Sequence, residues 1–538
     1  MKTKQPLFRI CQVALLIFAS LLIGSCGDFG APPVEREIPL TGQSNTYTLS
    51  EVDASGVSGT ALFEENENGN AVVTLTLNGT PAGGVHPAHI HFNSVAMGGD
   101  IAISLNPVDG STGISRTVVT QTDAGSAISY SGLLDFDGYI NVHLSPEDLT
   151  TIVAQGDIGS NVLTGNRKTY PLNESDVAGI SGEIVFEERI NGFALATITL
   201  AGTPDGGNHP AHIHENSAAM GGDIVFTFSP VDGSTGMSMS DTREGGMDGE
   251  PSLTFTDILA IDGYVNVHLS PEELATIVAQ GDIGSNELTG TTAVYSLNES
   301  DVDGISGEIT FAERLNGFAL ATIRLTGTPE GGTHPAHIHE NSVAMGGDIL
   351  FTFSPVDGST GVSMSDTREG GMDGEPALTY NDILGIDGYV NVHLSPDELA
   401  TIVAQGDIGS NELTGQSITY PLNTADVPGI SGEITFEERI NGFALATIRL
   451  DGTPDGGTHP AHIHENSVEE GGGILFTFTP VSGTSGESRS DTRDGGMDDE
   501  PSLTYAEILL IDGYVNVHLS PEELEVIVAQ GNIGANFQ

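Results

Sequence analysis

Two short motifs occur four times along this chain at a nearly constant spacing. The string HPAHIH begins at His86, His209, His334 and His459, with intervals of 123, 125 and 125 residues. The string NVHLS places its histidine at His143, His268, His393 and His518, at intervals of 125 residues. A period of this size is that of an independent domain, well above the roughly 20–50 residues of a solenoid repeat. The chain is therefore expected to fold as four domains in tandem.

The period divides the chain into repeat 1 (45–165), repeat 2 (166–290), repeat 3 (291–415) and repeat 4 (416–538), after a leader (1–26) and a tether (27–44). Repeats 2 to 4 are nearly identical, whereas repeat 1 has diverged, so residues that repeat 1 shares with the others are the more informative ones. Only about five residues, such as Gly290–Val294, separate consecutive units. Such short links favour a stiff string of domains over freely tumbling ones.

The N-terminus has the pattern of a bacterial secretion signal. A basic start with Lys2, Lys4 and Arg9 precedes an apolar stretch, Val13–Ile23, that is short for a membrane span. The stretch ends at Leu22–Cys26, which resembles a bacterial lipobox, a signal in which the cysteine is lipidated and becomes the first mature residue. The alternative is an ordinary signal peptide with an incidental cysteine.

We therefore expect a lipid-anchored protein of the bacterial cell envelope. Cys26 is the only cysteine left after removal of a leader that contains Cys11, so it has no intramolecular partner. The proline-containing segment 27–44 is the expected tether. Gly27 stands where an aspartate favours inner-membrane retention in some bacteria, so the outer membrane is the expected location.

Charge and composition exclude several classes of partner and site. The 74 acidic residues against 16 basic ones give a net charge of −58, which would repel nucleic acid. Two cysteines exclude a disulfide-stapled scaffold and a cysteine-based zinc site. A cation, a protein or a glycan remains as the ligand of such a chain, and the sequence does not choose between them.

Alternating apolar residues predict strands through most of each repeat. In Ala194–Leu200 every second residue is apolar and shares one face, and Ile224–Ser229 alternates until Pro230 ends the strand. The segment Ser270–Gly281 has helix capping signals at both ends and predicts one short helix. The expected fold is mainly β: four tandem β-sandwich or barrel-like domains, each with one short α-helix.

All 16 histidines lie in the two repeated motifs, which argues against their use as general polar residues. Strand alternation places His212 and His214 on the face opposite Ile213, and His268 on the face opposite Val267. If the two strands are neighbours, three imidazoles converge in each repeat. The predicted metal ligands are His89, His91 and His143; His212, His214 and His268; His337, His339 and His393; and His462, His464 and His518.

The first histidine of each HPAHIH motif is a weaker candidate ligand, because it has the opposite alternation and would need a bend at the following proline. These residues are His86, His209, His334 and His459. Imidazole suits zinc or copper, and three protein ligands leave a position open for water or substrate. Two alternatives remain open: histidines that bond backbone or carboxylate groups structurally, and surface histidines without partners. A methionine-dependent copper site is disfavoured, because repeat 4 has Glu469–Glu470 in the region of Met220.

An acidic loop in repeats 2 to 4 raises calcium as a less favoured cofactor. It spans Asp241–Glu250, Asp366–Glu375 and Asp491–Glu500, and oxygen-rich glycine turns can hold Ca²⁺. The spacing is not that of an EF-hand, and the corresponding Ser115–Ser126 of repeat 1 contains only Asp123. A solvated acidic loop is therefore the favoured interpretation.

The Ala-His-Ile-His segment, the Gly-Tyr-Val-Asn-Val-His strand and the terminal Gly-Asp-Ile-Gly segment resemble the CHRD domain, named after the repeated domain of chordin. The resemblance covers residues 45–538, all four copies. It implies an extracellular β-sandwich-like module without an established enzymatic activity, and supplies no catalytic residue. A weaker similarity, the His-x-His strand, is to copper/zinc superoxide dismutase, whose cysteine pair is absent here.

We therefore expect an anchored, non-enzymatic binding, adhesion or structural protein, with metal assistance. The alternatives are a zinc- or copper-dependent redox enzyme resembling superoxide dismutase, and surface modules stiffened by calcium.

Overall fold

The computed structural model describes residues 37–53, 55–243, 245–368, 370–493, 495–496 and 500–537. The predicted leader, Cys26 and most of the tether lie outside these residues. The described chain forms two compact units, one within 1–91 and 100–158, the other within 92–99 and 159–538. Among the described residues, no helix combines the length and the apolar character needed to cross a membrane.

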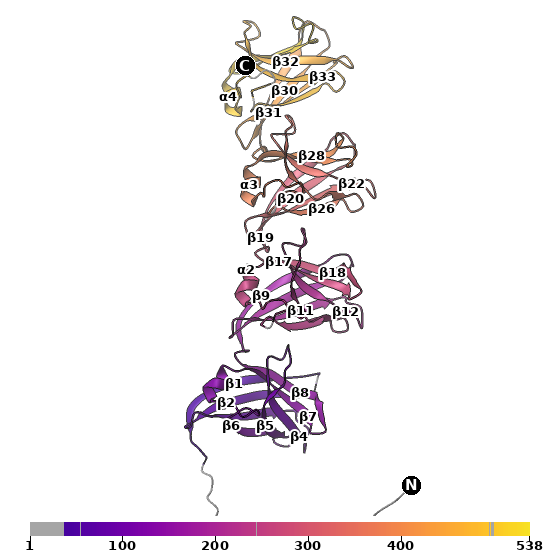
Figure 1. Ribbon diagram of the computed structural model, residues 1–538. Helices are drawn as coiled ribbons and strands as arrows, with labels where there is room; N and C mark the ends of the chain where they lie inside the picture. Colours follow the sequence, from indigo (N-terminus) through magenta and orange to yellow (C-terminus); the bar gives the residue numbers. More distant parts are fainter. Residues whose placement is uncertain are drawn as a thin grey trace, which may run out of the picture. The chain divides into compact units, whose positions relative to one another are not determined.

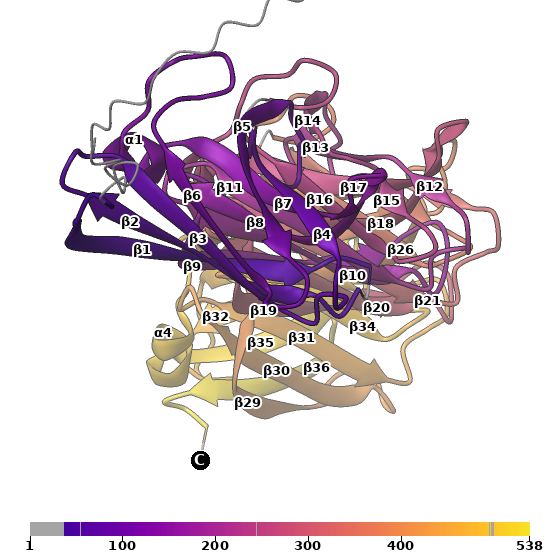
Figure 2. The same cartoon turned by 90° about the horizontal axis from the view of Figure 1, so that it is seen from below.

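Repeat 1 is a closed antiparallel barrel with the strand order β1-β2-β3-β6-β5-β4-β7-β8. Its elements are β1 (Leu40–Glu51), β2 (Ser58–Asn66), β3 (Ala71–Asn78), β4 (Val85–Phe92), β5 (Ile101–Asp109), β6 (Ile114–Val119), α1 (Tyr130–Leu134), β7 (Asp137–Ser145) and β8 (Asp148–Gly159). Figure 2 shows β4, β7 and β8 following one another in this ring.

Repeat 2 has the same order of strands, but two strands of the ring are each divided into two pieces. Its elements are β9 (Leu163–Glu174), β10 (Ser181–Arg189), β11 (Ala194–Ala201), β12 (Asn208–His209), β13 (Ala211–Glu215), β14 (Ile224–Thr227), β15 (Val231–Asp232), β16 (Met237–Asp241), α2 (Phe255–Ala260), β17 (Asp262–Ser270) and β18 (Glu273–Gly284). The break between β12 and β13 falls at Pro210, which has no N–H to donate to a neighbouring strand.

Repeat 3 has the same divided strands, whereas the two corresponding strands of repeat 4 are continuous, as in repeat 1. Figure 1 shows the helices of both repeats beside the strands of their own repeat. Repeat 3 consists of β19 (Leu288–Glu299), β20 (Ser306–Arg314), β21 (Ala319–Thr326), β22 (Thr333–His334), β23 (Ala336–Glu340), β24 (Ile349–Thr352), β25 (Val356–Asp357), β26 (Val362–Asp366), α3 (Tyr380–Gly385), β27 (Asp387–His393) and β28 (Ile402–Gly409). Repeat 4 consists of β29 (Leu413–Thr424), β30 (Ser431–Arg439), β31 (Ala444–Asp451), β32 (Thr458–Glu465), β33 (Ile474–Ser482), β34 (Glu487–Asp491), α4 (Tyr505–Leu510), β35 (Asp512–His518) and β36 (Ile527–Gly534).

The predicted fold class is confirmed: four tandem β domains, each with one short helix. The alternation in β11 is as expected, since Ala194, Ala196, Ile198 and Leu200 are buried in the barrel core. The first strand of each repeat begins earlier than the predicted boundary, at Leu40, Leu163, Leu288 and Leu413. The short links, including Gly290–Val294, are therefore part of a strand.

The position of the predicted helix was wrong. Ser270–Gly281 forms a turn and most of β18, which pairs with β17 through His268↔Ile277 and with β9 through Ala279↔Glu174. These pairings place β18 between β17 and β9 in the sheet, and their ladder of hydrogen bonds outweighs the local capping signals. The helix lies instead at α2, where Thr254 and Asp257 form a capping box.

Candidate metal centre

The two histidine motifs lie on neighbouring antiparallel strands. In repeat 2, β13 pairs with β17 so that His212 faces Asn266 and His214 faces Tyr264. Ile213 belongs to the barrel core, so the alternation of β13 places the two histidines on the opposite face of the sheet. The neighbouring strands that the sequence analysis required are therefore present.

Each repeat brings its three predicted ligands together, with one nitrogen of each ring within 4.8 Å of the others. The clusters are His89, His91 and His143; His212, His214 and His268; His337, His339 and His393; and His462, His464 and His518. In repeat 2, Nδ1 of His212 lies 3.0 Å from Nε2 of His268. The same contact measures 3.0 Å in the other three repeats.

Backbone carbonyl groups orient two of the three rings in repeats 2 to 4. In repeat 2, Nδ1 of His268 donates to the oxygen of Leu274 (2.6 Å), and Nδ1 of His214 donates to the oxygen of Gly222 (2.9 Å). A carbonyl oxygen only accepts, so Nδ1 carries the proton in both rings and Nε2 has the electron pair: that of His214 has no hydrogen-bond partner among the described residues, and that of His268 accepts from Nδ1 of His212. Histidines that bind metals have this type of outer hydrogen bond.

Burial lowers the pKa of the first and third histidines of the cluster in repeats 1 to 3. It lowers the pKa of His212 to about 4, and repulsion from His268 and His214 acts in the same direction. The pKa of His337 falls to about 4 for the same reasons. Burial likewise lowers the pKa of His89 in the diverged repeat 1. Neutral imidazole is the form that binds a metal, so these rings are in the binding form at neutral pH.

Two further residues of the Gly-Tyr-Val-Asn-Val-His strand belong to the site, although the sequence analysis gave them no role. The ring of Tyr264 stacks on His214, with centroids 5.0 Å apart. Asn266 is 7% exposed, and its Oδ1 has no hydrogen-bond partner among the described residues. The same unpaired oxygen occurs in Asn141, Asn391 and Asn516. Alternation along the strand, which places Tyr, Asn and His on one face, was the signal that identifies them.

One carboxylate lies near the first ring of each cluster. Thr227 pairs with His212 across β13 and β14 and donates its hydroxyl to Glu250 (2.7 Å). In repeat 1, Ser104 pairs with His89 and donates its hydroxyl to Asp123 (2.7 Å). The loop, expected to be solvated, is exposed at residues 247–249, whereas Glu250 is held by Thr227 beside the site. Repeat 1 keeps this feature with Asp123 alone.

The weaker candidates His86, His209, His334 and His459 lie outside the clusters. Nδ1 of His209 donates instead to the carbonyl oxygen of His268, 3.2 Å away, and the residue is 1% exposed. The bend at Pro210 therefore does not bring this ring to the other three. His209 ties its strand to β17 beside the cluster.

Comparisons with known proteins do not identify a family for this chain. No family model matches it, and no curated protein matches it. Among solved structures, the chain is similar to one titled "Biofilm associated protein - BSP domain", with 10% sequence identity over 94% of this chain and 99% of that one. The TM-score is 0.13, which carries no argument about fold or function. The resemblance to the CHRD domain stays a prediction.

Proposed function

We propose that each repeat binds one zinc or copper ion on its three histidines, and that the protein is a non-enzymatic binding or structural protein of the cell envelope. The observation that carries the proposal is the fourfold occurrence of a cluster of three imidazoles, two of which are oriented by backbone carbonyl groups in repeats 2 to 4. Three imidazole nitrogens at these distances suit the tetrahedral geometry of zinc or the sites of copper.

The unpaired Oδ1 of Asn266 supports the same proposal. It lies on a buried residue directly across the ladder from His212, on the face that carries the three rings. A buried acceptor without a partner costs free energy, about 1–3 kcal/mol. A bound cation, or water on that cation, would satisfy this oxygen. Repeats 1 to 4 all retain the asparagine.

Calcium at the acidic loops has less support. Asp241, Asp366 and Asp491 are buried beside arginines, with Oδ2 of each carboxylate 3.4 Å from an arginine Nε. These carboxylates already have a cationic partner within the protein. The resemblance to the CHRD domain and to a lipobox at Cys26 supports the proposal that the four modules lie outside the cytoplasmic membrane on a lipid anchor. Loss of lipid labelling in Cys26→Ala would test the anchor.

The test of the proposed function is elemental analysis of the chain starting at Gly27, after dialysis against dilute Zn²⁺ or Cu²⁺. We expect one retained ion per repeat. His212→Ala should remove the ion of repeat 2 alone, because it deletes a ligand of that cluster. His209→Ala is the matched control: it removes a buried histidine of the same motif, outside the cluster, and should leave all ions bound. Ions retained in His212→Ala, or no ion in the unaltered chain, would contradict the proposal.

A superoxide dismutation assay on the copper-loaded protein separates the enzymatic alternative. A chelator removes free copper before the assay, and we expect the protein then to show no dismutation activity. Activity proportional to the number of intact clusters would overturn the non-enzymatic part of the proposal.

A further inference from the structure

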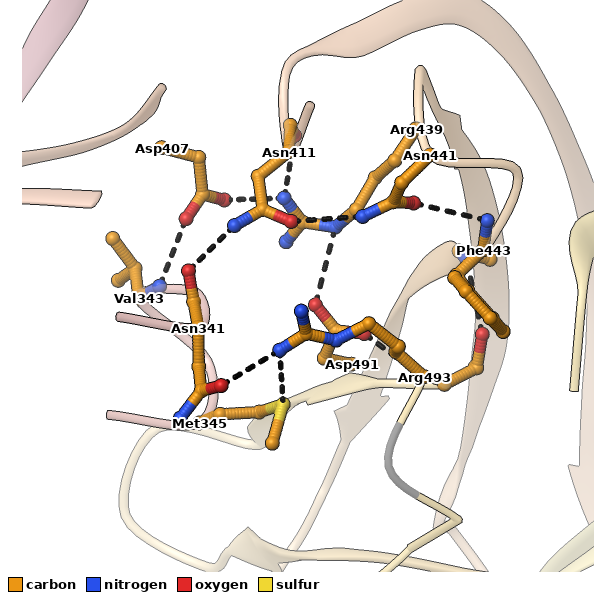
Figure 3. Close-up of polar contacts among 12 residues, drawn as sticks. Asn341, Val343, Met345, Asp407, Asn411, Arg439, Asn441, Phe443, Asp491 and Arg493 are labelled. Carbon is orange, nitrogen blue, oxygen red and sulfur yellow. Dashed lines mark hydrogen bonds and ion pairs between the residues drawn. The ribbon is translucent and has the colours of Figure 1, made fainter. Parts of the chain in front are cut away.

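One loop in repeat 3 lies between the histidine cluster and repeat 4. The loop Asn341–Gly347 is held at one end by His339, whose Nδ1 donates to the oxygen of Gly347 (3.0 Å). At its other end, Oδ1 of Asn341 accepts a hydrogen bond from Arg493 of repeat 4 (2.9 Å; Figure 3). A ring of the proposed metal site and a residue of the next repeat therefore act on the same short segment.

The loop is a defined turn with its own internal bonds. Asn341 has a φ of +68°, and its Nδ2 donates to the oxygen of Gly346 (3.0 Å). The backbone N–H of Val343 donates to Oδ1 of Asp407 (2.8 Å). The bond from Nδ2 of Asn341 to Gly346 joins the histidine end of the turn to Asn341 and is the route by which a change at one end reaches the other.

A buried arginine joins the two repeats beside this loop. Arg439 of β30 is 1% exposed, and its Nη1 donates to Oδ2 of Asp407 (2.7 Å) and to the oxygen of Asn411 (2.6 Å). Its Nε lies 3.4 Å from Asp491 of its own repeat. Figure 3 shows this arginine between Asp407 and Asp491. Arg493 also forms an ion pair with Asp387. Two arginines of repeat 4 therefore form ion pairs with carboxylates of repeat 3.

The junction between repeats 2 and 3 has the same contacts. Arg314 donates to Asp282 (2.7 Å), and Arg368 donates to Oδ1 of Asn216 (3.1 Å). Asn216 begins the loop whose Gly222 oxygen accepts from His214 (2.9 Å). The connection from ring to loop to arginine therefore occurs at both junctions within the second compact unit.

We propose that metal bound in one repeat stiffens the junction with the following repeat, through this shared loop. The inference rests on the proposed function. A metal on Nε2 of His339 fixes the ring and polarises its Nδ1–H, which strengthens the hydrogen bond to Gly347. The loop then loses freedom, and Asn341 is held in the position that receives Arg493. The metal thereby regulates the bending of the chain.

Spin-label distances across single junctions test this inference in the full chain starting at Gly27, which contains no cysteine. One labelled protein carries Glu308→Cys and Glu433→Cys, on exposed and equivalent positions of repeats 3 and 4. A second carries Glu183→Cys and Glu308→Cys, which span the preceding junction. We expect Zn²⁺ to narrow both distance distributions.

The His339→Ala substitution should abolish the narrowing between repeats 3 and 4 and leave that between repeats 2 and 3, which serves as the internal control. His337→Ala is a second variant, since it removes a metal ligand but keeps the bond from His339 to Gly347. It should also abolish the metal-dependent narrowing at the later junction alone. Unchanged hydrogen exchange in the strands of repeat 3 would verify that both variants fold.

Coupling between two sites is reciprocal, which gives a second measurement. Arg493→Met removes the contacts to Asn341 and Asp387 without touching a metal ligand, and should weaken Zn²⁺ binding in repeat 3 about fivefold. The inference would be overturned, while the proposed function stands, if the chain bound four ions and the distance distributions did not narrow. An unchanged Zn²⁺ affinity of repeat 3 in Arg493→Met would have the same meaning. Absence of bound ions in the unaltered chain would overturn both.

Discussion

The loops Asn341–Gly347 of repeat 3 and Asn466–Gly472 of repeat 4 have the same conformation but different contact residues. Both begin with an asparagine at positive φ, +68° and +67°. Both accept a hydrogen bond from the second histidine of the cluster, at 3.0 and 3.1 Å. Yet repeat 3 has Ala344–Met345 where repeat 4 has Glu469–Glu470. The loop conformation therefore does not depend on these residues.

The positions that differ are those that contact a following repeat. Ala344 and Met345 line a pocket together with Phe476 of repeat 4, and Met345 lies 3.8 Å from Arg493. The carboxylate Asp407 has two roles: Oδ1 accepts from Val343, and Oδ2 accepts from Arg439. Its counterpart Asn532 keeps the first role, accepting from Val468 (2.9 Å), but offers an amide nitrogen in place of the second oxygen.

Repeat 1 shows the complementary difference. The positions of Arg189, Asp241 and Arg243 of repeat 2 are occupied in repeat 1 by Asn66, Val118 and Thr120. The arginines therefore occur in repeats 2, 3 and 4, and the aspartates of repeats 2 and 3 accept from the arginines of repeats 3 and 4. Some residues therefore maintain the fold of a single repeat, and others join two repeats.

The largest effect is expected from Arg439→Met. The substitution leaves Asp491, which is 5% exposed, without its cationic partner. Breaking a buried ion pair on one side costs about 3–5 kcal/mol. Hydrogen exchange of β30 should report this loss in repeat 4. The control is Arg439→Met with Asp491→Val, which places a valine where repeat 1 has Val118 and should recover most of the stability. No recovery would show that the arginine acts through its packing.

A smaller effect is expected from Asp407→Asn, which gives repeat 3 the residue of repeat 4. The bond from Val343 is kept, but Arg439 loses one charged acceptor, at a cost of about 1.5–3 kcal/mol. The measurement is again hydrogen exchange at the junction. The matched control is Asn532→Asp, which should change stability little. The Asn532 side chain accepts from the N–H of Val468, and an aspartate oxygen can accept the same bond. Equal effects of the two substitutions would contradict the division of roles.

The fold and the clusters could be predicted because they depend on alternation within short segments. Ile213 between two histidines determines their common face, and the repeated motif supplies the second strand. The junction could not be predicted in this way. Arg439 and Asp407 belong to different repeats, and no local pattern pairs them. The helix was misplaced because Ser270–Gly281 has local caps, whereas its pairing partner Glu174 lies about a hundred residues earlier in the chain.

The smallest effect is expected at the helix caps, where repeat 1 again differs. In repeat 2, the hydroxyl of Thr254 accepts from the N–H of Asp257 and donates to its carboxylate (2.5 Å), which lowers the pKa of Asp257. In repeat 1, Ser129 caps the helix, but Gly132 occupies the position of the carboxylate. Thr254→Ala should therefore cost about 1 kcal/mol, measured by hydrogen exchange in α2.

The pH dependence distinguishes the two caps. A carboxylate with a lowered pKa in the folded state contributes stability above its unfolded value of 3.8, and this contribution is lost as the pH falls through the folded value. The cost of Thr254→Ala should thus shrink on acidification below about pH 4. The cost of Ser129→Ala should stay constant over the same range, because no carboxylate shares that cap. If the stability cost of both substitutions fell equally on acidification, the capping box would not be the cause of the acid sensitivity.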